Sequence, residues 1–362
     1  MRWSVLSAKG SIRPPRKIGL SSFLSISLGL LAISAIASSQ ERPAALSSQL
    51  DSYLSTTVRP STAERKLLMN GGPVSKLLDA DASKEVAVFG AVWIDAPVRR
   101  YVEAVEDIEN FEKGGGFILT KRISSPPALA DFSQLRLPED DVRDLKSCRV
   151  GDCQLKLGEK GLQAFRTEVN WNGPDTQAAA EAVMRRLAFE YVMGYLEGGN
   201  ERLAVYRDNS PPMFVAEEFR SMVNGMPSLT TYLPSIRRYL LEYPKVQLPD
   251  ATSFLYWQET EFGLKRTVRI NHLTIHEGAD STVVASKMLY ASHYFWTALE
   301  LRVPLPDTAR GPGFWLITVN RSRSDGLSGF TGLFVRRRVR SEVVNGVQAA
   351  LRATKNRLER SR

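Results

Sequence analysis

Alternating apolar residues predict a buried strand over residues 84–94. Both the even-numbered and the odd-numbered positions of this segment are mostly apolar, so it is expected to be buried on at least one side. Pro97 suits the first turn of a helix, and apolar residues over 98–108 keep helical spacing. Three glycines end that unit, and a second short strand is predicted over residues 117–123.

The pattern changes over residues 124–250, where helical spacing replaces alternation. The clearest helical pattern covers residues 176–196, and a second covers residues 229–243 with an interruption at Pro234. Proline pairs separate these patterns from one another. The block is therefore predicted to be a helical insertion between two strand-containing segments, the first of which begins with a short helix within residues 61–79.

Alternation returns after residue 250. Residues 253–261 and 265–276 predict a hairpin, residues 282–303 predict two strands joined by a bend, and residues 313–321 predict a last strand. A long terminal helix follows, with an apolar stripe made of Val335, Val339, Val343, Val347, Leu351 and Leu358. Because a sheet must cover an apolar face, we expect this helix to pack on it in an α+β fold.

The first 37 residues have the pattern of an export signal. Basic residues end at Lys17, an apolar stretch follows over residues 18–36, and Ala35-Ile36-Ala37 matches an A-x-A cleavage site. The alternatives are an uncleaved signal anchor and a buried helix. Export places the rest of the chain in the periplasm or at the outer face of the inner membrane, after a Ser/Thr-rich linker over residues 38–60.

The formal net charge of +9 is concentrated at the two ends of the chain. Basic residues dominate residues 1–40 and 321–362, and the segment between them is net acidic. This distribution and the export signal argue against a nucleic-acid partner. The basic side of the terminal helix predicts contact with an anionic membrane surface, or else a solvated face. With 43% hydrophobic residues, the composition is that of a globular protein.

The chain has two cysteines, Cys148 and Cys153. In an exported protein a pair this close predicts a disulfide, and Val150-Gly151-Asp152 offers a turn between them. A redox site and a metal site are the alternatives. The four-residue spacing and the distance to all three histidines in the sequence disfavour both. No metal and no cofactor is predicted.

The order of elements resembles that of START-like, or Bet v 1-like, proteins with the helix-grip fold. The residues that carry the resemblance are 88–97, the following helix with Asp107–Phe111, the strand 313–321 and the terminal helix. The resemblance implies a curved antiparallel sheet packed on the terminal helix, with an apolar cavity for a lipid or another hydrophobic small molecule. The START-like domain would consist of residues 61–123 and 251–362, and the insertion 124–250 would lid the cavity or fill it.

Within that cavity, we expect ligand contacts from Trp257, Phe295 and Trp315, and polar contacts from His293 and Arg321. For His293 the alternative is a satisfied core histidine, and for Arg321 it is a loop with an Arg–Asp pair. His272, His276, Glu259 and Glu261 are expected at the surface or at an edge.

Three functions remain open on this sequence. The first is a carrier of a hydrophobic small molecule. The second is an enzyme on the same fold, a cyclase or hydrolase that uses His293 with a carboxylate. The third is a non-catalytic envelope scaffold. The nucleophile and dinucleotide motifs of common enzymes are absent from the sequence, which favours the carrier.

Overall fold

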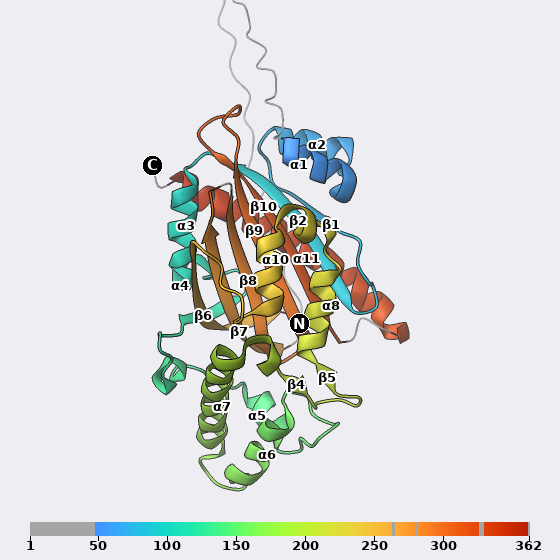
Figure 1. Ribbon diagram of the computed structural model, residues 1–362. Coiled ribbons are helices and arrows are strands. Elements are labelled where there is room, and N and C mark those ends of the chain that lie inside the picture. The colour runs from blue at the N-terminus through green and yellow to red at the C-terminus, as the bar shows by residue number, and fades with distance from the viewer. Residues whose placement is uncertain (1–47, 263–264, 280, 326–328, 361–362) are drawn as a thin grey trace, which may run out of the picture. The chain divides into compact units, whose positions relative to one another are not determined.

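An eight-stranded antiparallel sheet organises the protein in the computed structural model, which describes residues 48–262, 265–279, 281–325 and 329–360 (Figure 1). The strands lie in the order β1-β2-β10-β9-β8-β7-β6-β3. Their bounds are β1 Val74–Leu77, β2 Glu85–Ile94, β3 Phe117–Arg122, β6 Ala251–Phe262, β7 Lys265–Glu277, β8 Thr282–Ala291, β9 Phe295–Pro306 and β10 Phe314–Ser324.

One face of the sheet packs against α3 (Val98–Glu106), α4 (Ile108–Phe111) and the long α11 (Gly329–Arg360). We call it the terminal-helix face. Gly90 of β2 permits the closest approach, because a Cβ atom there would lie 2.7 Å from Val347 and 2.9 Å from Leu351 of α11. A larger residue would push the helix away from the sheet.

The helices of the insertion cover the other face, which we call the insertion face (Figure 1). They are α5 (Glu139–Leu145), α6 (Glu159–Glu168), α7 (Thr176–Gly198), α8 (Val215–Asn224), α9 (Pro227–Tyr232) and α10 (Pro234–Glu242), with a small hairpin of β4 (Val205–Tyr206) and β5 (Met213–Phe214). Because helices cover both faces, every residue of β2 is buried.

The structure confirms an α+β fold with an antiparallel sheet and a terminal helix on one face. The predicted hairpin, the bend between β8 and β9, and the helix broken at Pro234 are all present. The insertion was expected to lid or fill the cavity under the terminal helix. It packs instead on the opposite face, where the apolar side of α7 needs a partner.

The segment before β1 is more ordered than its Ser/Thr-rich composition suggested. Within the expected linker, α1 (Ser48–Tyr53) and a π-helical turn (Leu54–Val58) bury Leu50 and Leu54 in the core. A capping box at Ser61 then starts α2 (Thr62–Met69). The predicted leader, residues 1–37, lies outside the described residues.

Candidate functional site

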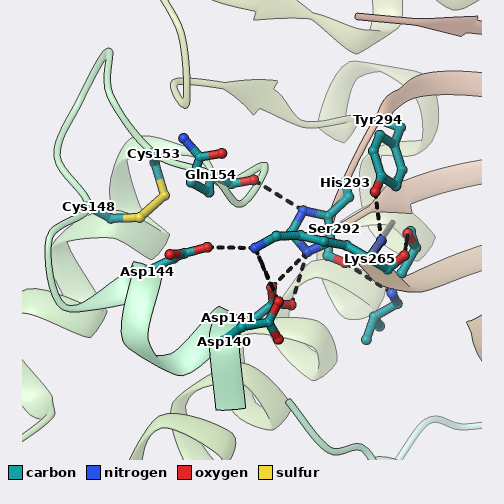
Figure 2. Close-up of polar contacts among 12 residues, drawn as sticks. Asp140, Asp141, Asp144, Cys148, Cys153, Gln154, Lys265, Ser292, His293 and Tyr294 are labelled. Carbon is teal, nitrogen blue, oxygen red and sulfur yellow. Dashed lines mark hydrogen bonds and ion pairs between the residues drawn. A yellow bond between two sulfur atoms is a disulfide. The ribbon is translucent and has the colours of Figure 1, made fainter. Parts of the chain in front are cut away.

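His293 lies in the bend between β8 and β9, and its ring is buried (Figure 2). Its Nε2 atom lies 2.9 Å from Oδ2 of Asp141, a residue of α5. Its Nδ1 atom lies 3.1 Å from the backbone oxygen of Gln154. The imidazole therefore bridges two parts of the insertion to the central sheet.

Both partners of this imidazole are hydrogen-bond acceptors, which decides how the ring is used. A carboxylate and a backbone carbonyl have no proton to give, so each ring nitrogen must donate one. The Nζ atom of Lys265 also donates to Asp141, at 3.2 Å. With both nitrogens of His293 donating, no ring nitrogen remains to take a proton from a substrate. The imidazole is therefore held by structural partners at both of its nitrogen atoms.

Lys265 and the disulfide complete this region (Figure 2). The Nζ atom of Lys265, at the start of β7, lies 2.5 Å from Asp144. The predicted disulfide between Cys148 and Cys153 is confirmed, and it closes the loop immediately before Gln154. These contacts hold α5 and the disulfide loop against the start of β7 and the end of β8. We call this group of residues the clasp: Asp141, Asp144, Lys265, His293 and the Cys148–Cys153 disulfide.

The predicted aromatic ligand contacts lie elsewhere. Trp257 and Trp315 are fully buried on the insertion face, opposite to α11. The Trp257 indole donates to the backbone of Asp131 at 3.0 Å, and the Trp315 indole donates to Asp307 at 3.1 Å. Phe295 is half-buried at the first position of β9. Neither tryptophan borders the space under the terminal helix.

Arg321 also lies on the insertion face, in a buried ion-pair network. Its Nη1 atom is 2.6 Å from Glu85, whose second oxygen binds Arg323 at 2.8 Å. Arg323 in turn reaches Glu218 of α8 at 2.7 Å. The partner of Arg321 is thus a glutamate of β2, far away in the sequence, rather than an aspartate of its own loop.

Two further surface expectations are wrong, and for one reason. His272 is buried and its Nδ1 atom lies 2.9 Å from the Tyr195 hydroxyl of α7. Glu259 is buried and accepts the backbone N–H of Arg136, and burial raises the pKa of its carboxyl. Both residues point to the insertion face, so the insertion covers positions that an open sheet would expose.

The terminal-helix face carries a group of polar residues that the sequence analysis missed. We call it the polar cluster, and it consists of Glu112, Gln258, Arg269, Asn271, Glu300 and Arg302. The Nη2 atom of Arg302 lies 2.9 Å from Glu112, and Gln258 donates to the other Glu112 oxygen at 2.6 Å. Arg302 also pairs with Glu300.

Position in the sheet explains this clustering. Glu300 and Arg302 alternate on β9, and Arg302 pairs in register with Thr318, which pairs with Gly90 under α11. Residues directly opposite in antiparallel strands share a face. The only sequence signal was pairs of polar residues two positions apart within a strand, Arg269 with Asn271 and Glu300 with Arg302. These pairs lie in segments too far apart to be linked by spacing.

Electrostatics within the cluster favour charged side chains. Burial by itself would raise the pKa of Glu300, but the Arg302 guanidinium outweighs it and the pKa is lowered. Tyr101 of α3 is fully buried nearby, and burial raises the pKa of its hydroxyl while Arg302 opposes that shift. The cluster thus keeps ion pairs inside a largely apolar layer.

A pocket of about 410 Å³ lies between α4 and β3. Its lining runs over residues 106–110, 112–113 and 117–122 and includes Glu112 and Thr120. Thr120 accepts a hydrogen bond from Gln258 at 3.1 Å. The polar cluster therefore borders a pocket whose volume is in the range that binds small molecules.

A second buried titratable group lies on the insertion face. Lys287 of β8 is almost fully buried, with its Nζ atom 4.5 Å from the centre of the Phe219 ring and 5.0 Å from that of Tyr195. Its Nζ atom donates to two neutral groups, the Asn200 side chain and the Tyr195 hydroxyl. Burial lowers the pKa of Lys287 to about 7 and, with the nearby lysine, that of His272 to about 3.

No protein-family model matches the sequence, and no curated protein matches it significantly. Among the described residues, no group of three or more His, Cys, Asp or Glu side chains is placed to hold a metal ion. Within those same ranges, the helices lack a segment both long and apolar enough to cross a membrane.

Proposed function

We propose that the protein is an exported START-like carrier, which holds a hydrophobic small molecule or lipid between the terminal-helix face of the sheet and α3, α4 and α11. Support comes from the order of elements. The strands β1 and β2, the helices α3 and α4, and β3 at the far edge of the sheet precede the insertion, and the remaining antiparallel strands and the terminal helix follow it. This order agrees with the helix-grip arrangement that the sequence resembles. Export rests on the leader pattern.

The observation that carries the proposal is a change in exposure along β9 and β10. Arg302 and Thr318 face each other and are buried. At the next pair on the same face, two register positions further, Glu300 faces Asn320, and the Glu300 side chain is 30% exposed although β9 has a strand on each side. A side chain in mid-sheet stays exposed where the covering layer stands away from the sheet, so a hollow on this face is supported.

The surroundings of Glu300 suit a largely apolar guest. Met288 and Ala298 pair in register on the same face. On α11, Val339, Val343 and Val344 are only partly buried although they contact the apolar core of this face. Apolar side chains that stay partly exposed at one place are typical of ligand sites. Membrane-surface contact by the basic part of α11 remains a prediction.

The test is to identify what the purified protein holds. The protein, expressed with its leader, is analysed by native mass spectrometry, and its binding of the neutral dye N-phenyl-1-naphthylamine is titrated. We expect an added mass that solvent extraction removes, and dye fluorescence that saturates. Ala298→Trp, which places a large side chain beside Glu300, is expected to weaken dye binding. Ala63→Trp, at an exposed position of α2, is the matched control.

Bare protein that also fails to bind the dye would contradict the carrier and favour the scaffold. Dye binding that Ala298→Trp and Ala63→Trp leave equally unchanged would place any ligand away from the terminal-helix face.

A further inference from the structure

Two buried hydrogen-bond donors on the terminal-helix face have no partner among the described residues. They are the hydroxyl of Tyr101, a residue with no exposed surface, and the Nη1 atom of Arg302. Both side chains lie beside the same ring: the Tyr101 ring is 6.1 Å from the centre of Phe111, and the Arg302 guanidinium is 5.4 Å from it. Buried donors are rarely left unpaired, because this costs free energy, so two unpaired donors at one place point to a ligand.

The rest of the polar cluster cannot supply their acceptor. One Glu112 oxygen accepts from Arg302 and the other from Gln258. Of the Glu300 oxygens, one binds Arg302 and the other accepts from Thr318 at 3.4 Å. The Tyr101 oxygen can itself accept from the Arg302 guanidinium, but the Tyr101 proton still needs an acceptor, and a bound molecule would supply it.

The charge balance of the cluster decides which acceptor fits. Its two carboxylates and two guanidinium groups cancel, and a third guanidinium, that of Arg357, lies 5.4 Å from the centre of the Phe111 ring but is exposed to solvent. A ligand carboxylate or phosphate would add an uncompensated buried charge next to Glu112 and Glu300, which is strongly unfavourable. A neutral oxygen accepts from both donors without that cost.

We propose that Tyr101 and Arg302 form a subsite for a neutral oxygen, a ketone or ester carbonyl, of an otherwise hydrophobic ligand. The subsite rests on the carrier function proposed above and names the class of molecule carried. The Tyr101 hydroxyl and the Arg302 Nη1 group donate to that oxygen, while the apolar side chains around Phe111 and Phe314 contact its hydrocarbon part; the Phe314 ring lies 5.9 Å from that of Tyr101.

The test uses three probes of equal chain length, 2-nonanone, nonane and nonanoate, each of which displaces N-phenyl-1-naphthylamine from the protein. For each probe, the concentration that displaces half of the dye is measured on the wild type and on Tyr101→Phe. The ratio of these two concentrations does not depend on the solubility of the probe. We expect Tyr101→Phe to weaken the binding of 2-nonanone about tenfold, which is the effect of losing one buried hydrogen bond. The binding of nonane should not change. On the wild type, nonanoate is expected to displace the dye less well than 2-nonanone.

Tyr256→Phe is the matched control. Tyr256 is buried on the same face, but its hydroxyl already binds Ser286 at 3.0 Å, so its loss should not weaken 2-nonanone selectively. Thermal unfolding checks that both variants fold. Tyr101→Phe should be at least as stable as the wild type, since it removes an unpaired buried hydroxyl.

The outcomes separate the two proposals. If the dye binds but Tyr101→Phe weakens nonane and 2-nonanone equally, or not at all, the subsite is overturned and the carrier stands. If the wild type binds nonanoate more tightly than 2-nonanone, the assignment of the subsite to a neutral oxygen is wrong. If the dye does not bind the wild type, the carrier itself fails.

Discussion

Lys287 provides the sharpest prediction for the folded protein, because burial of its ammonium group makes stability depend on pH. Its pKa falls from 10.5 to about 7 on folding, since the charged form loses its hydration among Phe219, Tyr195 and their neighbours. Between these two values the unfolded chain binds more protons than the folded one. Stability therefore rises as the pH rises from 7 toward 10.5.

The size of the effect follows from the shift. One pKa unit corresponds to roughly 1.4 kcal/mol, so raising the pH from 7 to 9.5 should raise the free energy of unfolding by about 3 kcal/mol. His272 does not contribute in this window, because its folded pKa of about 3 and its ordinary value both lie below it. The buried tyrosines have raised pKa values, so they lower the free energy of unfolding as the pH approaches their ordinary value near 10. The contribution of Lys287 is therefore the difference between the wild type and a variant that lacks this lysine.

Urea unfolding at a series of pH values between 7 and 9.5 measures this slope. Lys287→Met keeps a side chain of similar length against the Phe219 ring and removes the charge, so the slope should nearly vanish. Lys66→Met, at an exposed position of α2, should keep the wild-type slope. A Lys287→Met protein whose stability still rises by about 3 kcal/mol over this range would refute the assignment to this lysine.

Three further predictions concern the clasp and the terminal helix. His293→Ala should cost about 1–3 kcal/mol, because Asp141 keeps Lys265 as a partner, and Asp141→Ala should cost more; the double variant should cost less than the sum, and additive losses in urea unfolding would contradict the contact between the two side chains. Replacing Cys148 and Cys153 together by serine should lower the free energy of unfolding by about 2 kcal/mol, which is the loop-closure contribution of a short ring. Thermal unfolding with and without reductant measures this loss, and a reduced protein as stable as the oxidised one would contradict it. Gly90→Ala should destabilise the protein by about 1–3 kcal/mol, because the added methyl group meets α11. Gly346→Ala is the control, since no atom lies within 4 Å of a Cβ placed there. Proteolysis that releases α11 more readily from Gly90→Ala than from Gly346→Ala would confirm the contact.

Much of the fold was predictable because it is periodic. Alternation over residues 84–94 and after residue 250 gave the strands, and helical spacing gave α7 and α11. β1 was not predicted, since four residues after a Gly-Gly-Pro sequence show too little alternation to detect. The helices at 48–58 were hidden by serine and threonine around the few apolar residues that become buried.

The candidate site was less predictable. His293 was expected either as a core histidine or as a polar group in a cavity, and nothing in its sequence neighbourhood indicates Asp141, which lies 152 residues away. The polar cluster could not be found at all, because Glu112, Gln258 and Arg302 come from three segments that only strand register brings together.

By itself, the sequence determined the long strands, the long helices and the disulfide pair, because periodicity and short spacing are local properties of a chain. Only the tertiary structure decided which side of the sheet each helix covers. Apolar residues with polar ones among them lie on both faces of the sheet, so the sequence pattern did not indicate which face would receive the insertion. Packing between distant segments decided it. That choice buries Trp257, Trp315 and Arg321 beneath the insertion and leaves the polar cluster beside the terminal helix.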